Sequence, residues 1–243
     1  MKFSENDIVG QVVAHDYRTA AVFKQFGIDF CCKGNRSIAE VCTRKNLSPE
    51  TVLERLARAT EASDALADNF KDWDLDLLAD YIEKRHHRYV TEKIAEIMPF
   101  LNKVVRVHGE RHPELAQIES LFRGAAEELI NHMKKEEMIL FPYVRNLVRA
   151  AREGKEMPAP PFGTVENPIR VMQHEHDTEG DRFRKIAELS NNYTPPEDAC
   201  TTYRVVFLML KAFEEDLHLH IHLENNILFP KAIELEQSGQ PVE

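Results

Sequence analysis

Two segments of the chain repeat a histidine and a glutamate at the same spacing. His132 stands four residues before Glu136, His220 stands four residues before Glu224, and each pair is followed at a fixed distance by Leu-Phe-Pro. Residues four apart in a helix lie one above the other on the same face. An imidazole nitrogen and a carboxylate oxygen placed in this way can bind one metal ion. The repeated pair therefore predicts a site for two metal ions, built from two similar halves.

The apolar residues around both pairs predict that the pairs face a helical core. Leu129 precedes His132 and Leu217 precedes His220, and both leucines belong to apolar stripes that advance in steps of three and four. Such a stripe is typical of the buried face of a helix. The histidines and glutamates thus occupy positions where a bundle would normally have leucine. A buried carboxylate without a partner is strongly unfavourable, and a bound metal ion is the simplest compensation.

Two further helices, over 74–107 and 168–190, each offer two candidate histidines, and the helical phase separates them. Counting 3.6 residues per turn, His86 shares a face with apolar residues, whereas His87 shares one with charged residues. By the same count His176 faces inward and His174 faces outward. The predicted metal ligands are therefore His86, His132, Glu136, His176, His220 and Glu224.

This donor set favours iron or manganese. Carboxylates can bridge two ions while imidazoles terminate them, and inward Glu and His on paired helices are typical of di-iron and di-manganese centres. Six protein ligands cannot saturate two six-coordinate ions, so water, an oxo group or a small diatomic molecule must complete the coordination. We expect two non-haem iron ions with oxo and carboxylate bridges, and we regard manganese as the weaker candidate.

Single buried histidines are more often hydrogen-bonded core residues than ligands, but four of them with two in-phase glutamates favour metal binding. The other histidines are interpreted as surface or structural residues: His15, His87, His108, His112, His174, His218 and His222. Glu128, one turn before His132, and Glu175, beside His176, are either groups that orient imidazoles and carry protons or ordinary surface acids.

Cys31 and Cys32 form a vicinal pair with two interpretations. They are buried packing residues, or they are thiols near a helix start, with a lowered pKa, that bind metal or react with oxidants or nitric oxide. The four cysteines contain no Cys-x-x-Cys spacing, which argues against a structural zinc site.

The composition predicts an all-α protein with two parts. Only 9 glycines interrupt long runs rich in Glu, Leu, Ala, Lys and Arg. Residues 1–60 are expected to form a small helical domain, 61–72 a polar linker, and 73–243 a four-helix bundle. The fourth long helix is expected to follow the capping signal Thr194-Pro-Pro-Glu197.

Charge and hydropathy argue against two classes of partner. The net charge of -10 disfavours binding to nucleic acid or to anionic lipid. No apolar run approaches the roughly 20 residues that span a bilayer, and the first residues lack the apolar core of a secretory signal. We expect a cytoplasmic protein without membrane or nucleic-acid partners.

At the level of motifs, the chain resembles the repair-of-iron-centres proteins of the ScdA/YtfE type over nearly its whole length. The resemblance rests on Gly27-Ile-Asp-Phe-Cys31-Cys32-Lys-Gly34, His132-Met-Lys-Lys-Glu136-Glu, Met172-x-x-Glu175-His176-Asp177, Asn191-Asn-x-Thr194-Pro-Pro-x-x-Ala199-Cys200-Thr201 and His220-x-x-x-Glu224-Asn-Asn. It implies a hemerythrin-like bundle whose two bridging glutamates and four histidines occupy the positions selected by helical phase.

The resemblance also implies a function. Such a protein helps to restore iron–sulfur clusters damaged by nitric oxide or peroxide, either by donating iron or by binding and reducing nitric oxide, and it is cytoplasmic and often a homodimer. Damaged iron–sulfur proteins and nitric oxide are the partners it implies. Two alternatives stay open: an enzyme that reduces nitric oxide, and a hemerythrin-type protein that binds oxygen or nitric oxide. We lean towards a repair factor rather than an enzyme.

Overall fold

The structure is a computed structural model that describes residues 3–60, 70–155 and 160–239. Within these ranges the chain is helical, with one isolated antiparallel bridge between Ile8 and Ser37, and the prediction of an all-α fold is confirmed. No helix in the described part of the chain has both the length and the apolar character needed to cross a membrane.

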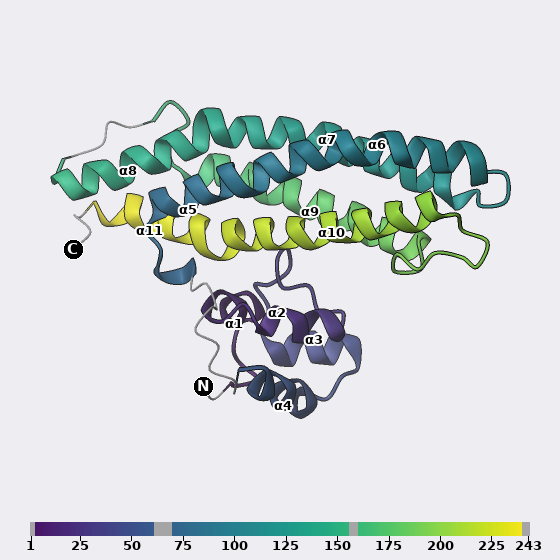
Figure 1. Ribbon diagram of the computed structural model, residues 1–243. Helices are drawn as coiled ribbons and strands as arrows, with labels where there is room; N and C mark the ends of the chain where they lie inside the picture. Colours follow the sequence, from purple (N-terminus) through teal and green to yellow (C-terminus); the bar gives the residue numbers. More distant parts are fainter. Residues whose placement is uncertain (1–2, 61–69, 156–159, 240–243) are drawn as a thin grey trace.

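Four long helical rods form the bundle (Figure 1). Rod one joins α5 (Leu75–Tyr81), η2 (Ile82–His87) and α6 (Arg88–His108), and rod two joins α7 (Glu114–Lys135), η3 (Glu136–Leu140) and α8 (Phe141–Glu153). Rod three is α9 (Glu166–Leu189), and rod four joins α10 (Thr201–Leu223), η4 (Glu224–Leu228) and α11 (Phe229–Ser238). Helix α7 packs on α9 and α6, and α10 packs on α6.

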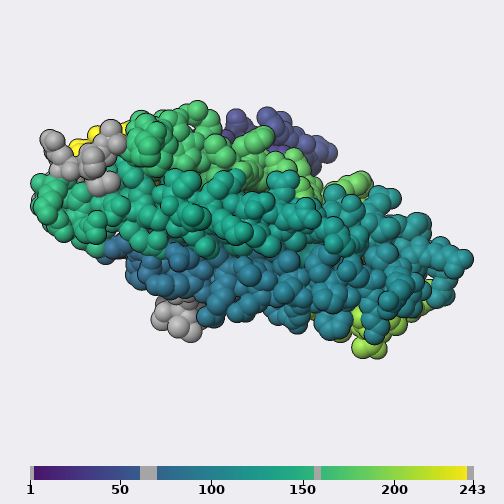
Figure 2. Space-filling model, turned by 90° about the horizontal axis from the view of Figure 1, so that it is seen from above, coloured from purple at the N-terminus to yellow at the C-terminus, as the bar shows by residue number. Residues whose placement is uncertain are grey.

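A smaller helical unit precedes the bundle and packs against it. It contains α1 (Val9–His15), α2 (Thr19–Gln25), α3 (Ile38–Lys45) and α4 (Pro49–Thr60). The start of α3 is fixed by a capping box, in which the Ser37 hydroxyl accepts the Glu40 N–H and the Glu40 carboxylate accepts the Ser37 N–H. Seen from above in Figure 2, α5 to α9 cover the near face and the small unit emerges behind them.

Part of the segment expected to be a linker is ordered structure that packs on the bundle. Residues 61–69 of the predicted 61–72 linker lie outside the described residues, but Phe70–Asp72 form the short helix η1. The Phe70 ring is buried, with its centroid 5.0 Å from that of Trp73 and 5.4 Å from that of Tyr81. Aromatic burial therefore extends the bundle to residue 70.

Rod four begins later than the sequence predicted. The residues after Thr194 form a loop, and α10 starts at Thr201 with Cys200 as its N-cap. Just before this loop Asn191, Asn192 and Tyr193 have positive φ angles, which end α9. The Thr-Pro-Pro-Glu sequence belongs to this turn, so its interpretation as the helix start was wrong.

The core consists of two apolar clusters separated by polar residues. One cluster includes Leu129 together with residues of the small unit. The other cluster includes Leu140 together with residues of α5, α8 and α11. His132 and Glu136 fall between these two leucines along rod two, and both are buried. The fold therefore places the predicted ligands in a polar layer between two apolar ones.

Candidate di-metal centre

Three short π-helical segments set the orientation of the candidate ligands. Segment η2 ends at His87, η3 begins at Glu136, and η4 begins at Glu224. A π-helix has i to i+5 hydrogen bonds and so fits more residues into a turn than an α-helix, and it occurs mostly at functional sites. The side chains in these segments therefore leave the regular helical phase at the point where the polar layer lies.

The π segment η2 overturns one prediction. His87 was expected to face outward, but it is 2% exposed, and His86 beside it is 1% exposed. The prediction failed because it counted 3.6 residues per turn, whereas the wider turn brings both imidazoles inside the bundle. His174 lies exposed on α9.

The first group of potential ligands combines His132, Glu136, His176 and Glu224, with donor atoms within 4.8 Å of one another. The two Nε2 atoms of His132 and His176 are 3.1 Å apart. His132 Nε2 is 3.3 Å from Glu136 Oε2, and His176 Nε2 is 3.1 Å from Glu224 Oε2. Four donors converge on one point in the manner of a metal site.

A second group uses the same two glutamates. It combines His87, Glu136, His220 and Glu224, again within 4.8 Å. His87 Nε2 lies 3.4 Å from Glu136 Oε2, and His220 Nε2 lies 3.1 Å from Glu224 Oε1. Because Glu136 and Glu224 belong to both groups, they occupy the position of bridging ligands between two neighbouring ions.

His86, the residue predicted from helical phase, lies outside both groups in the described structure. Its Nδ1 is 3.1 Å from Asp216 Oδ2, and its ring stacks on that of His220 with the centroids 5.6 Å apart. Its Nε2 is buried and has no hydrogen-bond partner. Rod one therefore offers two adjacent imidazoles, each with a buried Nε2 that has no hydrogen-bond partner among the described residues.

The unpaired polar atoms of the centre fit bound cations. Among the described residues, both carboxylate oxygens of Glu136, Oε2 of Glu224 and Nε2 of His87 are buried without a hydrogen-bond partner. Buried polar atoms are nearly always paired, so a cluster of exceptions calls for a missing partner. The oxygen and nitrogen donors present here suit iron or manganese.

The electrostatics of the centre keep both glutamates ionised. Burial and the neighbouring Glu224 carboxylate raise the pKa of Glu136, but His132 and His87 lower it more, so its net pKa lies below the ordinary value. Burial also raises the pKa of Glu224, and His220 and His176 bring it well below that value. Two anionic carboxylates side by side in a buried site are stable only with positive charge between them.

The outer nitrogens of four imidazoles have partners that fix their orientation. His132 Nδ1 is 2.8 Å from Glu175 Oε2, His87 Nδ1 is 2.8 Å from Glu137 Oε1, and His176 Nδ1 is 2.9 Å from Asn225 Oδ1. Asp216 takes this place for His86. Such partners fix the tautomer and orientation of ligating histidines and raise their basicity.

The sequence identified one of these partners and missed three. Glu175 contacts His132, and this contact holds the pKa of Glu175 at about 2. Glu128, the other candidate, pairs with Arg182 and is mostly exposed. Asp216 stands four residues before His220, a spacing that would have indicated it, whereas Asn225 and Glu137 are marked only by their position next to a bridging glutamate.

A cavity connects the first group with the surface. It measures about 180 Å³, and its lining includes His132, His176, Glu128, Glu175 and Glu179. Glu179 is 3% exposed, and among the described residues its carboxylate has no hydrogen-bond partner, although the Arg182 guanidinium lies 3.5 Å from Oε1. Burial raises its pKa to about 7. The cavity is large enough for a diatomic molecule and for water.

The vicinal cysteines lie directly against the centre. Cys32 Sγ is 3.4 Å from the carbonyl oxygen of His176, and the Asn225 amide donates to the carbonyl oxygen of Cys31 at 3.4 Å. Asn225 thus bridges the cysteine loop and His176. The Asp29 carboxylate accepts the N–H groups of both cysteines and holds the loop in shape.

The expected lowering of the thiol pKa does not hold for Cys31. The hydrogen bond with Cys32, burial and the nearby Asp29 carboxylate raise the pKa of Cys31 well above its ordinary value. The loop precedes α3, which starts only at Ile38, and the N–H of Gly10 in the first turn of α1 donates to the carbonyl oxygen of Gly34 rather than to a thiol. The pKa of Cys31 is raised because the nearby charge is negative and water is excluded, and both disfavour the thiolate.

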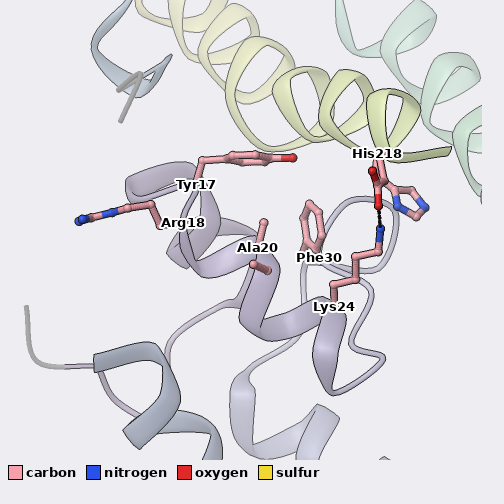
Figure 3. A pocket seen from close by; sticks show the side chains of 8 residues that line it. Tyr17, Arg18, Ala20, Lys24, Phe30 and His218 are labelled. Atoms are coloured by element: carbon pink, nitrogen blue, oxygen red, sulfur yellow. Dashed lines mark hydrogen bonds and ion pairs between the residues drawn. The ribbon is translucent and has the colours of Figure 1, made fainter. Parts of the chain in front are cut away.

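The small unit also contacts α10 on the far side of the cysteine loop. A cavity of about 350 Å³ lies between α2 and α10. Its lining includes Tyr17, Phe30 and His218 (Figure 3). The Lys24 ammonium pairs with the Glu215 carboxylate at 2.8 Å across its edge. Burial lowers the pKa of His218 to about 4, so this imidazole is neutral and structural.

Two domain families match the chain. Residues 78–232 match the hemerythrin HHE cation binding domain, and residues 5–60 match the ScdA N-terminal family, described as a domain of unknown function (DUF542). The first match covers both groups of candidate ligands and the second covers the cysteine loop.

Relatives align over almost the whole chain. The iron–sulfur cluster repair protein ScdA of Staphylococcus haemolyticus (strain JCSC1435) is 32% identical over 94% of this chain and 98% of its own length. The iron–sulfur cluster repair protein YtfE of Yersinia pestis (strain Pestoides F) is 32% identical over 94% of this chain and 97% of its own. YtfE of Escherichia coli O17:K52:H18 is 33% identical over 93% and 96%. With its buried His and Glu groups in a hemerythrin-like bundle, the chain belongs to the ScdA/YtfE family of iron–sulfur cluster repair proteins.

Proposed function

We propose that this protein is a non-haem di-iron factor that repairs iron–sulfur clusters damaged by nitrosative or oxidative stress. The observation that carries the proposal is the pair of buried, ionised carboxylates Glu136 and Glu224, each shared by two groups of histidines. Relatives that align along nearly the full chain are named iron–sulfur cluster repair proteins, which supports the same function here.

Each ion would take two imidazoles and share both glutamates. The first would be held by His132 and His176, and the second by His220 and one histidine of the adjacent pair on rod one. In the described structure, His87 is the member of that pair whose donor atom lies within 4.8 Å of those of Glu136, His220 and Glu224. His86 remains the member predicted from helical phase. Iron bound there supplies a centre that takes up a diatomic ligand such as nitric oxide, and a store of iron from which a damaged cluster is rebuilt.

The protein residues have separate tasks around this centre. Glu175 and Asn225 orient the imidazoles of the first group, and the two apolar clusters exclude bulk water. The cavity beside His132 admits small molecules. The cysteine loop packs on α9 at His176, where Cys32 Sγ contacts the carbonyl oxygen of this candidate ligand.

We further propose the cellular setting that the family resemblance implies. The protein acts in the cytoplasm as a homodimer, its clients are damaged iron–sulfur proteins, and nitric oxide is a ligand of the centre. Residues 1–60 form its thiol-bearing domain and residues 73–243 its di-iron bundle. Manganese is the less favoured metal for this site.

The first test is the metal content of protein purified without oxygen. We expect about two iron atoms per chain, held by two sets of imidazoles and carboxylates. Protein that is empty as isolated, and stays empty after anaerobic reconstitution with a ferrous salt, would remove the basis of the proposal.

The second test is repair itself. An iron–sulfur enzyme inactivated by nitric oxide is incubated with the iron-loaded protein, and its activity is compared with that after addition of the same amount of ferrous salt. We expect faster and fuller recovery with the protein, and a loss of this advantage in Glu136→Ala. Recovery no better than with the salt would contradict a repair function.

One observation favours a second candidate, the reduction of nitric oxide. Formation of nitrous oxide and water from two nitric oxide molecules consumes two protons and two electrons, and Glu179 is a buried carboxyl group beside the cavity whose pKa of about 7 suits proton donation. With an added reductant, nitrous oxide formation over many turnovers that falls in Glu179→Gln would support this candidate. A single stoichiometric burst, unchanged in the variant, would argue for binding alone.

A further inference from the structure

A second cluster of reactive groups lies at the opposite end of the bundle from the small unit's α1. It forms where α6 ends and α10 begins, at the right of Figure 1. His108 Nε2 is 3.2 Å from Cys200 Sγ, which is hydrogen-bond distance for a thiol. Helix α6 has 21 residues, so this pair lies about 30 Å along the helix from the His86–His87 end of the centre.

The two partners differ in exposure in a way that suits a reacting pair. Cys200 is exposed, whereas His108 is only 4% exposed. The buried imidazole can therefore accept the proton of the thiol, while the cysteine itself lies at the surface. A nucleophile and a base within hydrogen-bond distance are the usual arrangement for an activated cysteine.

His108 has no other hydrogen bond that would explain a buried histidine at this position. Its Nδ1 is buried and has no partner among the described residues. The ring lies against Tyr203, with the centroids 5.3 Å apart. An apolar side chain would fill this place without leaving a polar atom unpaired, so stability alone does not favour histidine here.

Cys200 is also unusual as the N-cap of α10, a helix of 23 residues. Ser, Thr, Asp and Asn are preferred there because their oxygen accepts a free backbone N–H. The Cys200 side chain makes no such bond, and its partner is His108 instead. The positive end of the helix dipole favours negative charge on the sulfur at this position.

The other cysteines lack these features. Cys31 and Cys42 are buried, and burial is the leading or second cause of a raised pKa in each. Cys32 is partly buried and contacts the backbone of α9. Among the described residues Cys200 is the only exposed cysteine, and its sulfur has an imidazole nitrogen at 3.2 Å.

We propose that Cys200 and His108 form a thiol–imidazole pair that undergoes thiol–disulfide exchange with low-molecular-weight disulfides. The His108 Nε2 takes the thiol proton, and the Cys200 sulfur attacks one sulfur of the disulfide. A new S–S bond joins Cys200 to one half of the reagent as the original S–S bond breaks. The other half leaves as a thiolate, which receives the proton from His108 and departs as a thiol. The protein thiol is oxidised to a mixed disulfide and half of the reagent is reduced.

The test uses the full-length protein with glutathione disulfide as the probe, and peptide mass spectrometry to locate and time the modification. We expect Cys200 to react first, and about tenfold faster at pH 7 than a free cysteine derivative under the same conditions. We expect His108→Gln to lose this advantage. His112→Gln is the matched control, because His112 is a neighbouring imidazole that pairs with Glu114 and Asp198 and not with the thiol.

A rate measurement at pH 10 shows whether His108 acts by accepting the thiol proton or only by packing around the thiol. Every accessible thiol is largely ionised there, so the rate at Cys200 should be equal in the native protein and in His108→Gln. The titratable and charged groups near the pair include Arg111, His112, Glu114, Asp198, Tyr203 and Arg204, and all are retained in this comparison.

Three results would overturn the proposal. The first is a Cys200 rate in the native protein no higher than that of the free cysteine derivative at pH 7. The second is an equal rate at pH 7 in the native protein and in His108→Gln. The third is a loss in His108→Gln that persists at pH 10, since that would assign His108 to packing around the thiol.

Discussion

At the scale of single residues, the centre depends on two neighbouring buried carboxylates, each of which is contacted by two histidines. Glu136 and Glu224 are both 0% exposed, and each is within 3.5 Å of two imidazole nitrogens. Neither can be replaced by an alanine without removing an oxygen donor from both ligand groups. A bridging role therefore predicts that each single substitution affects both ions.

We expect Glu136→Ala and Glu224→Ala each to lower the iron content from about two atoms per chain to one or fewer, because each removes a shared donor. Inductively coupled plasma mass spectrometry on protein purified without oxygen measures this. Glu128→Ala serves as the control, since Glu128 is exposed and contacts Arg182 rather than an imidazole. Iron content that stays normal in both glutamate variants would contradict the assignment.

The adjacent histidines on rod one give a second prediction. Both have a buried Nε2 without a partner and a carboxylate on Nδ1, so removal of both must empty one position. We expect the double variant His86→Ala/His87→Ala to keep about one iron atom per chain, with His174→Ala unchanged. The single variant that reproduces this loss identifies the ligand, and a double variant that retains two iron atoms would exclude both histidines.

Glu214 gives a prediction on the pH dependence of stability. It is 7% exposed, and burial raises its pKa from 4.5 to about 7. Between pH 4.5 and 7 the unfolded chain releases this proton while the folded protein retains it, so the free energy of unfolding falls as the pH rises through this range.

We therefore expect Glu214→Gln to be more stable than the native protein above pH 7, by about 3 kcal/mol, and equal to it at pH 4. Urea unfolding at the two pH values measures the difference. Glu215→Gln, an exposed neighbour paired with Lys24, should show no comparable gain at pH 8. A gain in Glu214→Gln of the same size at pH 4 would point to a cause other than titration.

At the scale of elements, the π segments and the two asparagines in η4 organise the centre. Asn225 accepts a hydrogen bond from His176 and donates one to the carbonyl oxygen of Cys31, while Asn226 donates to the carbonyl oxygen of Phe30. One helical segment therefore contacts a ligand on one side and the cysteine loop on the other. Asn225 acts through His176 as a positioning residue.

We expect Asn225→Ala to lower the affinity for iron about tenfold, since loss of such a partner usually weakens metal binding by that order, and to speed alkylation of Cys31. Asn226→Ala is the matched control: it should speed alkylation of Cys31 and leave iron affinity unchanged. Competition with a ferrous chelator and mass spectrometry provide the two measurements. Equal effects of both variants on iron affinity would show that Asn225 only helps the two units to dock.

Sequence reasoning at this scale succeeded where the helical repeat is regular. His132 and His220 lie on standard apolar stripes of α7 and α10, and the structure places both with the glutamates that follow them. It failed at His87, because a π turn is set by the hydrogen bonds of the folded rod and leaves no periodic mark in the sequence. It also failed at Thr194, where a capping pattern belongs to a turn that ends one helix before the next begins.

At the scale of the whole molecule, the all-α bundle and its family could be predicted from residue spacing and motifs. The contact between Asn225 and Cys31 could not, because it joins positions far apart in the chain and depends on how the small unit packs on the bundle. The raised pKa of Cys31 has the same origin: an adjacent thiol, burial and the charge of Asp29 act together only in the folded protein.

The centre should also stabilise the molecule as a whole. Metal ions bind only the folded arrangement of ligands from four rods, so loading favours the folded state. We expect removal of iron by a chelator to lower the melting temperature by about 5–10 °C, and ferrous salt to restore it. Calorimetry of loaded and stripped protein measures this. The same shift in the Glu136→Ala variant would show that the chelator acts elsewhere.

The three π turns lie where one extra residue is accommodated in each of three rods. Shortening a rod by one residue inside such a turn would restore an ordinary α-helix with little rotation of the part that follows, because the widened turn already absorbs the extra residue. For rod one this would return His86 and His87 to the regular phase, in which only one of the two imidazoles faces the interior. Single-residue deletions between 82 and 87, 136 and 140, or 224 and 228 should therefore leave the rods folded but lower the iron content, and deletions in the α6–α7 loop should leave the iron content unchanged.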